Sequence, residues 1–296
     1  MNTKTFDKRK IISEKIIGSV SQLVPTSKLL YHYTDIQALQ GIVTSGELWA
    51  THASFLNDSQ EIIHALNLIN TIFRKLISEN NNDNILKSFI ENLKNYYSHH
   101  HHRDLFLISF SEKKDDLNQW RSYSNNGKGV CLVFDSEEFT EIKAYNSIQF
   151  AKIIYNEDDQ QKCIEQIINE SCSTHRSNDL DTADASLLCR SLLDFLVTII
   201  KHKAYKEEQE VRLILPNSHL EGMMDPLIHF RHKNNLLIPY IPISNGKHPA
   251  KITALKKVII GPTANSELTK RSIDMLFRIK NCNVETAFSE IPYREL

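Results

Sequence analysis

The pattern of apolar and polar positions changes its period twice between Leu29 and Thr51. The stretch opens and closes with apolar runs of strand-like composition, and between them apolar residues recur at the spacing of one helix face. These helix positions are Ile36, Leu39, Ile42 and Val43. Asp35 is placed to cap the helix, and Gly46 to end it in a left-handed conformation. The pattern therefore predicts a tight strand, helix and strand unit.

This unit brings His32 and Thr34 to the end of its first strand, next to the N-terminus of the helix. Backbone N–H groups that are free at a helix N-terminus attract polar and anionic groups. We therefore expect His32 and Thr34 to face these N–H groups and to form part of a site for a polar ligand.

Helical periodicity recurs along the rest of the chain. It predicts helices over residues 6–24, 59–78, 85–97, 115–124 and 266–279. Two more helices are expected within residues 161–205, separated by the polar segment 173–184. We interpret residues 161–205 as a helical insertion that forms a lid or a side lobe.

Runs of β-branched and aromatic residues between turn-forming segments predict strands. The expected strands cover residues 105–111, 129–135, 148–156, 205–216, 236–243 and 256–262, with a closing strand near 283–288. Within 205–216, the period of two places Glu208, Glu210 and Arg212 on one face and Val211 and Leu213 on the other. Strands and helices mixed in this way indicate the α+β class.

Composition narrows the range of partners and compartments. The chain has 296 residues, of which 41% are hydrophobic and 24% charged, as in a globular protein. Its net charge of -1 gives no global footprint for nucleic acid or an anionic membrane. Five cysteines without a CxxC pair favour a reducing, cytoplasmic setting over a disulfide framework. Neither a secretion signal nor a membrane span is expected.

Four consecutive histidines, 99–102, invite comparison with a metal site. Chelation from one helix prefers ligands at i and i+4, and adjacent residues point in different directions, so a solvated loop is the favoured interpretation. A metal-dependent nuclease or hydrolase built from His32, Asp58, His64 and this run lacks convincing ligand spacing. We therefore expect no metal cofactor.

Five ordered motifs extend over nearly the whole chain. They are YHYTD with LQGIVTSGELWAT, then FLNDSQE, then LISFSEKKDDLNQWRSYSNNGKGVCLVFD, then YKEEQEVRLI, and finally KKVIIGP. In this order the motifs resemble the bacterial domain-of-unknown-function family 2971. That family in turn resembles the ADP-ribosyltransferase superfamily, which includes diphtheria-toxin-like and poly(ADP-ribose) polymerase enzymes. The opening unit is also similar to that of the DarT DNA-modifying toxins.

The resemblance implies one ADP-ribosyltransferase-like domain over residues 1–296, with a helix at 6–24 and a helical insertion at about 161–205. Its core would be a split, mostly antiparallel pair of sheets decorated with helices. NAD would bind as the substrate in the cleft between the sheets, without a metal.

The superfamily pattern also implies roles for individual residues. His32 would hold the adenosine ribose, Thr34 would position the nicotinamide ribose, and Tyr123 or Trp120 would stack on the nicotinamide. Tyr33 and Ser109 complete the expected NAD-binding residues. The later glutamate of the pattern matches Glu210, which would accept the ribose 2'-hydroxyl, with Glu208 polarising the acceptor; the literal ExE leaves either glutamate able to take the catalytic role.

Elementary chemistry makes a glutamate reasonable here, because cleavage between nicotinamide and ribose passes through an oxocarbenium-like state that a fixed carboxylate stabilises. Each residue also has a structural interpretation. His32 could be a core histidine, and Glu210 with Arg212 an ion pair on a solvated strand. Trp120 is expected in the core with Tyr123 facing the cleft.

One further set of residues stays open between two roles. Asn57, Asp58 and Glu61 suit either a helix cap or the substrate site.

The expected function is ADP-ribosyl transfer from NAD to a macromolecule, by a bacterial toxin or phage-defence effector. Protein, DNA and RNA all remain open as the acceptor, and the sequence sets neither the oligomeric state nor a regulating partner. The alternatives are an NAD glycohydrolase and a non-catalytic module that binds NAD or ADP-ribose.

Overall fold

The computed structural model describes residues 11–12, 27–56, 60–99, 105–141, 149–215, 228–233, 235–244, 254–263 and 265–292. Only Ile11 and Ile12 of the expected helix at 6–24 belong to these ranges, and both are helical. Asn57, Asp58 and three of the four consecutive histidines lie outside the described residues.

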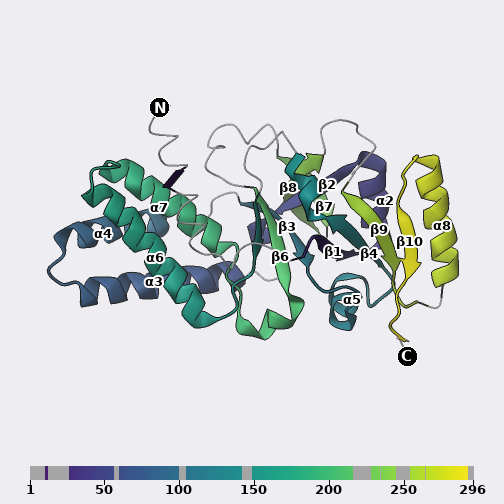
Figure 1. Cartoon of the computed structure of the whole chain (residues 1–296), viewed down its shortest axis with the longest axis horizontal. Helices are drawn as coiled ribbons and strands as arrows, with labels where there is room; N and C mark the ends of the chain where they lie inside the picture. The colour runs from purple at the N-terminus through teal and green to yellow at the C-terminus, as the bar shows by residue number, and fades with distance from the viewer. Residues whose placement is uncertain are drawn as a thin grey trace.

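The described strands form one mixed, mostly antiparallel sheet of ten strands, which confirms the α+β class (Figure 1). The strands are β1 (Leu29–Thr34), β2 (Glu47–His52), β3 (Phe106–Ser111), β4 (Val130–Asp135), β5 (Gln149–Lys152), β6 (Glu210–Leu215), β7 (His229–Lys233), β8 (Leu236–Ser244), β9 (Leu255–Ile260) and β10 (Glu285–Phe288). Their order is β10-β9-β4-β1-β3-β2-β8-β7, with β6 paired to β3 and β5 paired to β6.

The sheet branches at β3. One edge of β3 pairs with β6 along its whole length. The other edge is shared, because β1 joins it only at Ser111, while β2 joins it at Phe106 and Leu107. The expectation of two separate sheets is therefore wrong in its hydrogen bonding, since β3 connects both halves into one sheet. Among the described strands, none pairs with this edge of β3 from Ile108 to Phe110, where β1 and β2 separate.

Helices cover the two ends of this sheet. The helices are α2 (Ile36–Ser45), α3 (Gln60–Glu79), α4 (Asn84–His99), α5 (Leu117–Tyr123), α6 (Glu157–Arg176), α7 (Thr182–Val197) and α8 (Ser266–Ile279), with 3-10 turns at Ala53–Phe55, Ser136–Glu141 and Lys203–Glu208. Helices α3, α4, α6 and α7 pack together as one lobe, and α8 lies beside β10 at the opposite end (Figure 1). No helix in the described parts of the chain combines the length and apolar character needed to span a bilayer.

The local signals of the opening unit are confirmed. The Asp35 side chain accepts a hydrogen bond from the Ala38 N–H at 2.7 Å, and Gly46 ends α2 with a φ of 72°. The cap has a consequence for His32, because Asp35 already occupies this N–H at the helix N-terminus. His32 bonds to the carbonyl of Ser109 instead of facing these N–H groups.

Two expected boundaries differ from the structure. Helix α6 starts at Glu157 and continues to Arg176, so the break before α7 is shorter than the expected segment 173–184. Asn156 and Asp181 cap the two helices and set these starts. Asp181, within the segment, therefore begins a helix instead of continuing a long loop.

Strand β6 begins later than the pattern indicated. The residues before it form the 3-10 turn that ends at Glu208, and Gln209 follows in the left-handed region with a φ of 44°. Glu208 therefore does not share a strand face with Glu210, as the period of two had predicted. Val211 and Leu213 do lie on the opposite face, where they join the core of the sheet.

Gly129 fits tightly beside β1, and we expect Gly129→Ala to be destabilising. A Cβ at this position would lie 2.1 Å from the backbone oxygen of Thr34. Because a strand backbone cannot yield as a flexible side chain can, the variant should lose about 1–3 kcal/mol of unfolding free energy in chemical denaturation. Gly41→Ala is the control, because nothing lies within 4 Å and α2 should gain about 0.5–1 kcal/mol. Equal shifts in both variants would contradict this account.

Candidate functional site

A cavity of about 440 Å³ opens where β1 and β2 separate along β3. Its walls come from strands on both sides of this branch, from α5, from the segment before β6, and from the β7 and β8 hairpin. The volume lies within the usual range of small-molecule sites. The branch in the sheet therefore supplies a concave site lined by residues far apart in the sequence.

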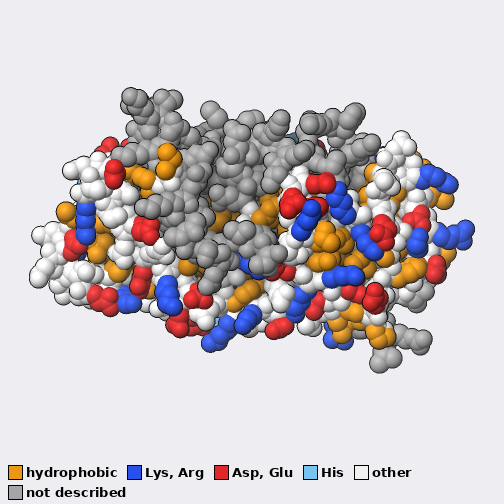
Figure 2. All heavy atoms as spheres, in the orientation of Figure 1, with side chains coloured by type: hydrophobic (Ala, Val, Ile, Leu, Met, Phe, Trp, Pro, Cys, Tyr) orange, Lys and Arg blue, Asp and Glu red, His pale blue; other side chains and the backbone are white. Residues whose placement is uncertain are grey.

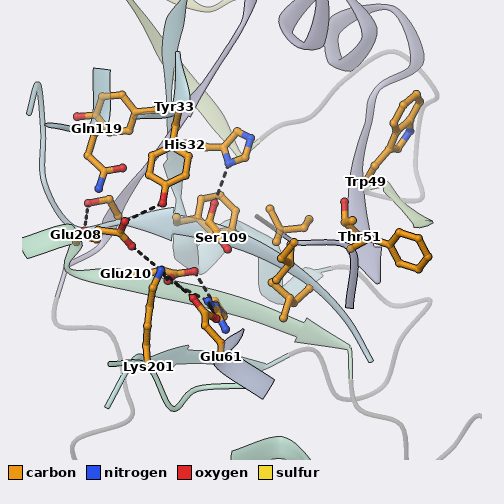
Figure 3. Close-up of a pocket in the computed structure, with 18 of the residues that line it drawn as sticks. His32, Tyr33, Trp49, Thr51, Glu61, Ser109, Gln119, Lys201, Glu208 and Glu210 are labelled. Atoms are coloured by element: carbon orange, nitrogen blue, oxygen red, sulfur yellow. Dashed lines mark hydrogen bonds and ion pairs between the residues drawn. The ribbon is translucent and has the colours of Figure 1, made fainter. Parts of the chain in front are cut away.

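His32 lies on β1 in the cavity wall, and its hydrogen bond fixes its tautomer. Its Nδ1 lies 2.8 Å from the Ser109 carbonyl oxygen, which can only accept, so Nδ1 carries the hydrogen (Figure 3). Burial lowers the pKa of His32, against the opposing effect of this hydrogen bond, and favours the neutral ring. In that form Nε2 is a hydrogen-bond acceptor, suited to a hydroxyl group of a ligand.

The other conspicuous part of the wall is a set of five charged residues that we name the acidic cluster. Its members are Glu61, Lys201, Glu208, Glu210 and Arg212, and all five line the cavity. Three carboxylates face two cations in this cluster, which leaves an excess of one negative charge.

Lys201 lies at the centre of the acidic cluster. Its Nζ contacts Glu61 at 3.0 Å, Glu208 at 2.7 Å and Glu210 at 3.0 Å (Figure 3). The negative charges of Glu210 and Glu61 outweigh burial and raise the pKa of Lys201. Its ammonium group therefore stays charged.

Arg212 links the cluster to two helices. Its guanidinium donates at 2.7 Å to Glu61 on α3, to Glu210 on its own strand, and to the carbonyl of Thr198 after α7. Glu210 and Arg212 form the expected ion pair. The expectation that this pair lies on a solvated strand is wrong, because both side chains are buried.

The two glutamates of the ExE differ in environment. Burial alone would raise the pKa of Glu210, but Arg212 and Lys201 outweigh it and lower the pKa to about 2. Both Glu210 oxygens accept from these cations, and its side chain is 7% exposed. The Glu208 side chain is 18% exposed, and one of its oxygens accepts from the Tyr123 hydroxyl at 2.7 Å. Its other oxygen pairs with Lys201 at 2.7 Å, so Glu208 is the more accessible of the two carboxylates but still belongs to the ion-pair network.

Tyr123 projects from the end of α5 into the cavity wall, as expected for the residue that faces the cleft. Burial and the adjacent Glu208 raise the pKa of its hydroxyl, which stays protonated and donates to the glutamate. Trp120 is fully buried, and its Nε1 donates to Asp115 at 2.7 Å. The expected division of the pair into one core and one cleft residue is confirmed.

Not every expected site residue reaches the cavity in the same way. Thr34 pairs with Val130 in the sheet and does not line the cavity. Tyr33 borders the cavity, but its hydroxyl donates to the Lys113 carbonyl and accepts from the Asp116 N–H, so it holds the turn before α5. Ser109 borders the cavity and orients His32 through its carbonyl.

Sequence reasoning missed Lys201 and Arg231, and it left Glu61 undecided. Weak signals existed, because Lys201 directly follows an apolar run and Glu61 stands one turn before Ala65 on the buried stripe of α3. A charged residue that continues a buried stripe indicates a buried partner. The partners themselves come from distant parts of the chain.

The low pKa of Glu210 predicts acid sensitivity of the fold. A carboxyl whose pKa is lowered from 4.5 to about 2 on folding adds stability above pH 4.5, and that contribution is lost as the pH falls from 4.5 toward 2. The difference corresponds to about 3 kcal/mol. Denaturant unfolding between pH 7 and 2.5 should show this loss, and Glu210→Gln should show less of it. If the free energy of unfolding falls with pH as steeply in Glu210→Gln as in wild type, the acid sensitivity belongs to other carboxyls.

Charges elsewhere on the visible face are mixed in sign, with basic and acidic side chains interspersed (Figure 2). Among the described residues, no group of three or more His, Cys, Asp or Glu side chains is arranged to hold a metal ion. Asp58 and three of the four consecutive histidines lie outside these residues.

Comparison with known proteins gave one match, to a segment of the chain. No curated protein and no solved structure gives a significant match. Residues 119–213 match the model of a family described as "Protein of unknown function (DUF2971)". The matched segment runs from α5 into β6 and contains Tyr123 and four members of the acidic cluster. This match supports the expected resemblance to the DUF2971 family over this segment of the chain.

Proposed function

We propose that this protein is an NAD-dependent ADP-ribosyltransferase that modifies a macromolecule, either a protein or a nucleic acid, as a bacterial toxin or phage-defence effector. One observation carries the proposal: a single cavity holds a tautomerically fixed histidine together with a carboxylate-rich cluster that has one excess negative charge. In this proposal, NAD binds in the cavity at the branch of the sheet, where β1 and β2 separate along β3.

The reaction accounts for the excess negative charge. The bond between the ribose C1' and the pyridinium nitrogen breaks, and its electron pair returns to the ring, so nicotinamide leaves neutral. Positive charge moves onto the ribose as an oxocarbenium-like state before the acceptor attacks C1' and loses its proton. A fixed carboxylate in a partly desolvated cavity stabilises this charge more than bulk water does.

Particular residues suit the steps of this reaction. Glu208 is exposed enough to contact the nicotinamide ribose, and Glu210 holds Lys201 and Arg212 in place below it. The ring of Tyr123 offers a face for the nicotinamide. Nε2 of His32 accepts a hydrogen bond from a ribose hydroxyl.

The test uses the full chain and NAD labelled on its adenosine side, with and without cell lysate, DNA and RNA. Label on a macromolecule together with nicotinamide release supports the transferase and names its acceptor. Nicotinamide release without transfer instead indicates an NAD glycohydrolase. Binding of NAD without release indicates a binding module. If NAD neither reacts nor raises the melting temperature, the proposal fails.

A further inference from the structure

Arg231 on β7 lines the same cavity but belongs to no ion pair within the described part of the chain. Its Nη2 donates to the Thr51 hydroxyl at 2.8 Å, which fixes the guanidinium against β2. Its Nε is buried and has no hydrogen-bond partner among the described residues. The guanidinium of Arg231 is therefore a partly buried positive charge in the cavity wall that no carboxylate of the described residues neutralises.

A buried N–H group without a partner is unfavourable, and a partly buried charge without a counter-charge adds to that cost. Burial accordingly lowers the pKa of Arg231. A guanidinium presents several N–H donors in a planar fork that matches the oxygens of a phosphate. The chemistry of Arg231 thus fits an anionic, multidentate ligand group better than a neutral one.

The surroundings of Arg231 also suit a nucleotide. Its guanidinium lies over the ring of Trp49, 5.6 Å from the centroid, and Trp49 stacks on Tyr240 at 4.3 Å. The Trp49 side chain remains partly exposed. Lys233, on the same face of β7 by the period of two, adds a second positive charge to the lining. Phosphate donors and an aromatic surface thus occur together at this end of the cavity.

We infer that Arg231 and Lys233 form a phosphate subsite, and that it receives the pyrophosphate of a dinucleotide whose reacting ribose lies at Glu208. This inference rests on the proposed function for the identity of the dinucleotide. In Figure 3, Trp49 and Thr51 lie at one end of the cavity, Glu208 and Lys201 lie toward the other, and His32 lies between them. The cavity is therefore electrically asymmetric, as NAD is, with its cationic ring and anionic pyrophosphate.

The test measures binding of adenosine, ADP and ADP-ribose to the full chain by calorimetry, with ADP as the probe of the phosphate subsite. Wild type should bind ADP at least tenfold more tightly than adenosine. Arg231→Gln should weaken ADP binding about 10- to 100-fold and leave adenosine nearly unchanged, because charged hydrogen bonds are lost. Arg231→Lys should fall between the two. Arg271→Gln, at an exposed position of α8, is the matched control and should bind ADP as wild type does.

Two results would overturn the subsite: equal affinity of wild type for adenosine and ADP, or unchanged ADP binding in Arg231→Gln. Lys233→Gln, at an exposed position, serves as a second variant if Arg231→Gln does not fold, and it should weaken ADP binding several-fold. Nicotinamide release from NAD, measured on the same preparations, separates the two proposals. If ADP binding depends on Arg231 but no nicotinamide is released, the phosphate subsite is retained and the transferase proposal fails. If nicotinamide is released but ADP binding does not depend on Arg231, the transferase proposal is retained and the phosphate subsite fails.

Discussion

Arg212→Met should lower the free energy of unfolding by about 3–5 kcal/mol, the range found when one partner of a buried ion pair is removed. Arg212 donates to two buried carboxylates, Glu61 and Glu210, and to the carbonyl of Thr198. A methionine of similar length fills the space but leaves these acceptors without their donor. The acidic cluster would then hold three carboxylates against Lys201 alone, so its excess negative charge would double.

Chemical denaturation at pH 7 measures this loss, with Lys270→Met as the matched control. Lys270 pairs with Asp274 one turn along α8, where both side chains are at least partly exposed to solvent. Removal of such a pair should cost about 0.5 kcal/mol or less. The double variant Glu61→Gln with Arg212→Met should recover part of the loss, because it removes one uncompensated charge. An Arg212→Met protein within 1 kcal/mol of wild type would mean that the cluster does not hold α3 to β6.

Glu208→Gln should reduce nicotinamide release from NAD by about 10²- to 10³-fold, the usual effect of removing one electrostatic stabiliser of a transition state. The amide keeps the size of the side chain and can still accept from the Tyr123 hydroxyl, but it lacks the charge that opposes the oxocarbenium-like state. Glu208 is partly exposed and does not pair with Arg212. The melting temperature of Glu208→Gln should therefore change less than that of Glu210→Gln.

Parallel assays of Glu208→Gln and Glu210→Gln decide which glutamate acts on the ribose. Nicotinamide release and thermal unfolding are measured on both variants, so that loss of activity is distinguished from loss of fold. A folded but inactive Glu208→Gln supports Glu208 as the group that contacts the ribose. A folded, inactive Glu210→Gln beside an active Glu208→Gln would transfer this role to Glu210. Full activity in both variants would remove the glutamates from the mechanism.

Local structure followed from the sequence where neighbouring residues determine it. The helix at 266–279 has the expected bounds, and Asp35 and Gly46 begin and end α2 as predicted. Helical periodicity and caps act within a few residues, so a short window of sequence contains the information that they need. The division of Trp120 and Tyr123 between core and cavity did not follow from periodicity, because residues three apart lie on the same helix face.

The turn before β6 shows where this reasoning stopped. Alternating charges from Glu208 to Arg212 have the period of a strand, yet Glu208 ends a 3-10 turn and Gln209 turns left-handed. The two glutamates are close together because both pair with the ammonium group of Lys201, although Glu208 lies in the 3-10 turn and Glu210 in β6. Periodicity is evaluated over a short stretch of sequence, so it gives no information about an ion-pair partner that lies elsewhere in the chain.

The sequence by itself determined the class of the fold, nearly all of its helices and strands, and the candidacy of His32, Tyr123, Glu208 and Glu210. Only the tertiary structure decided that β3 joins both halves of the sheet, that Glu61 pairs with Arg212 across 151 positions, and that Arg231 reaches the same cavity. The physical reason is that strand pairing and buried ion pairs join residues distant in the chain. Their energies depend on burial and geometry that no local pattern contains.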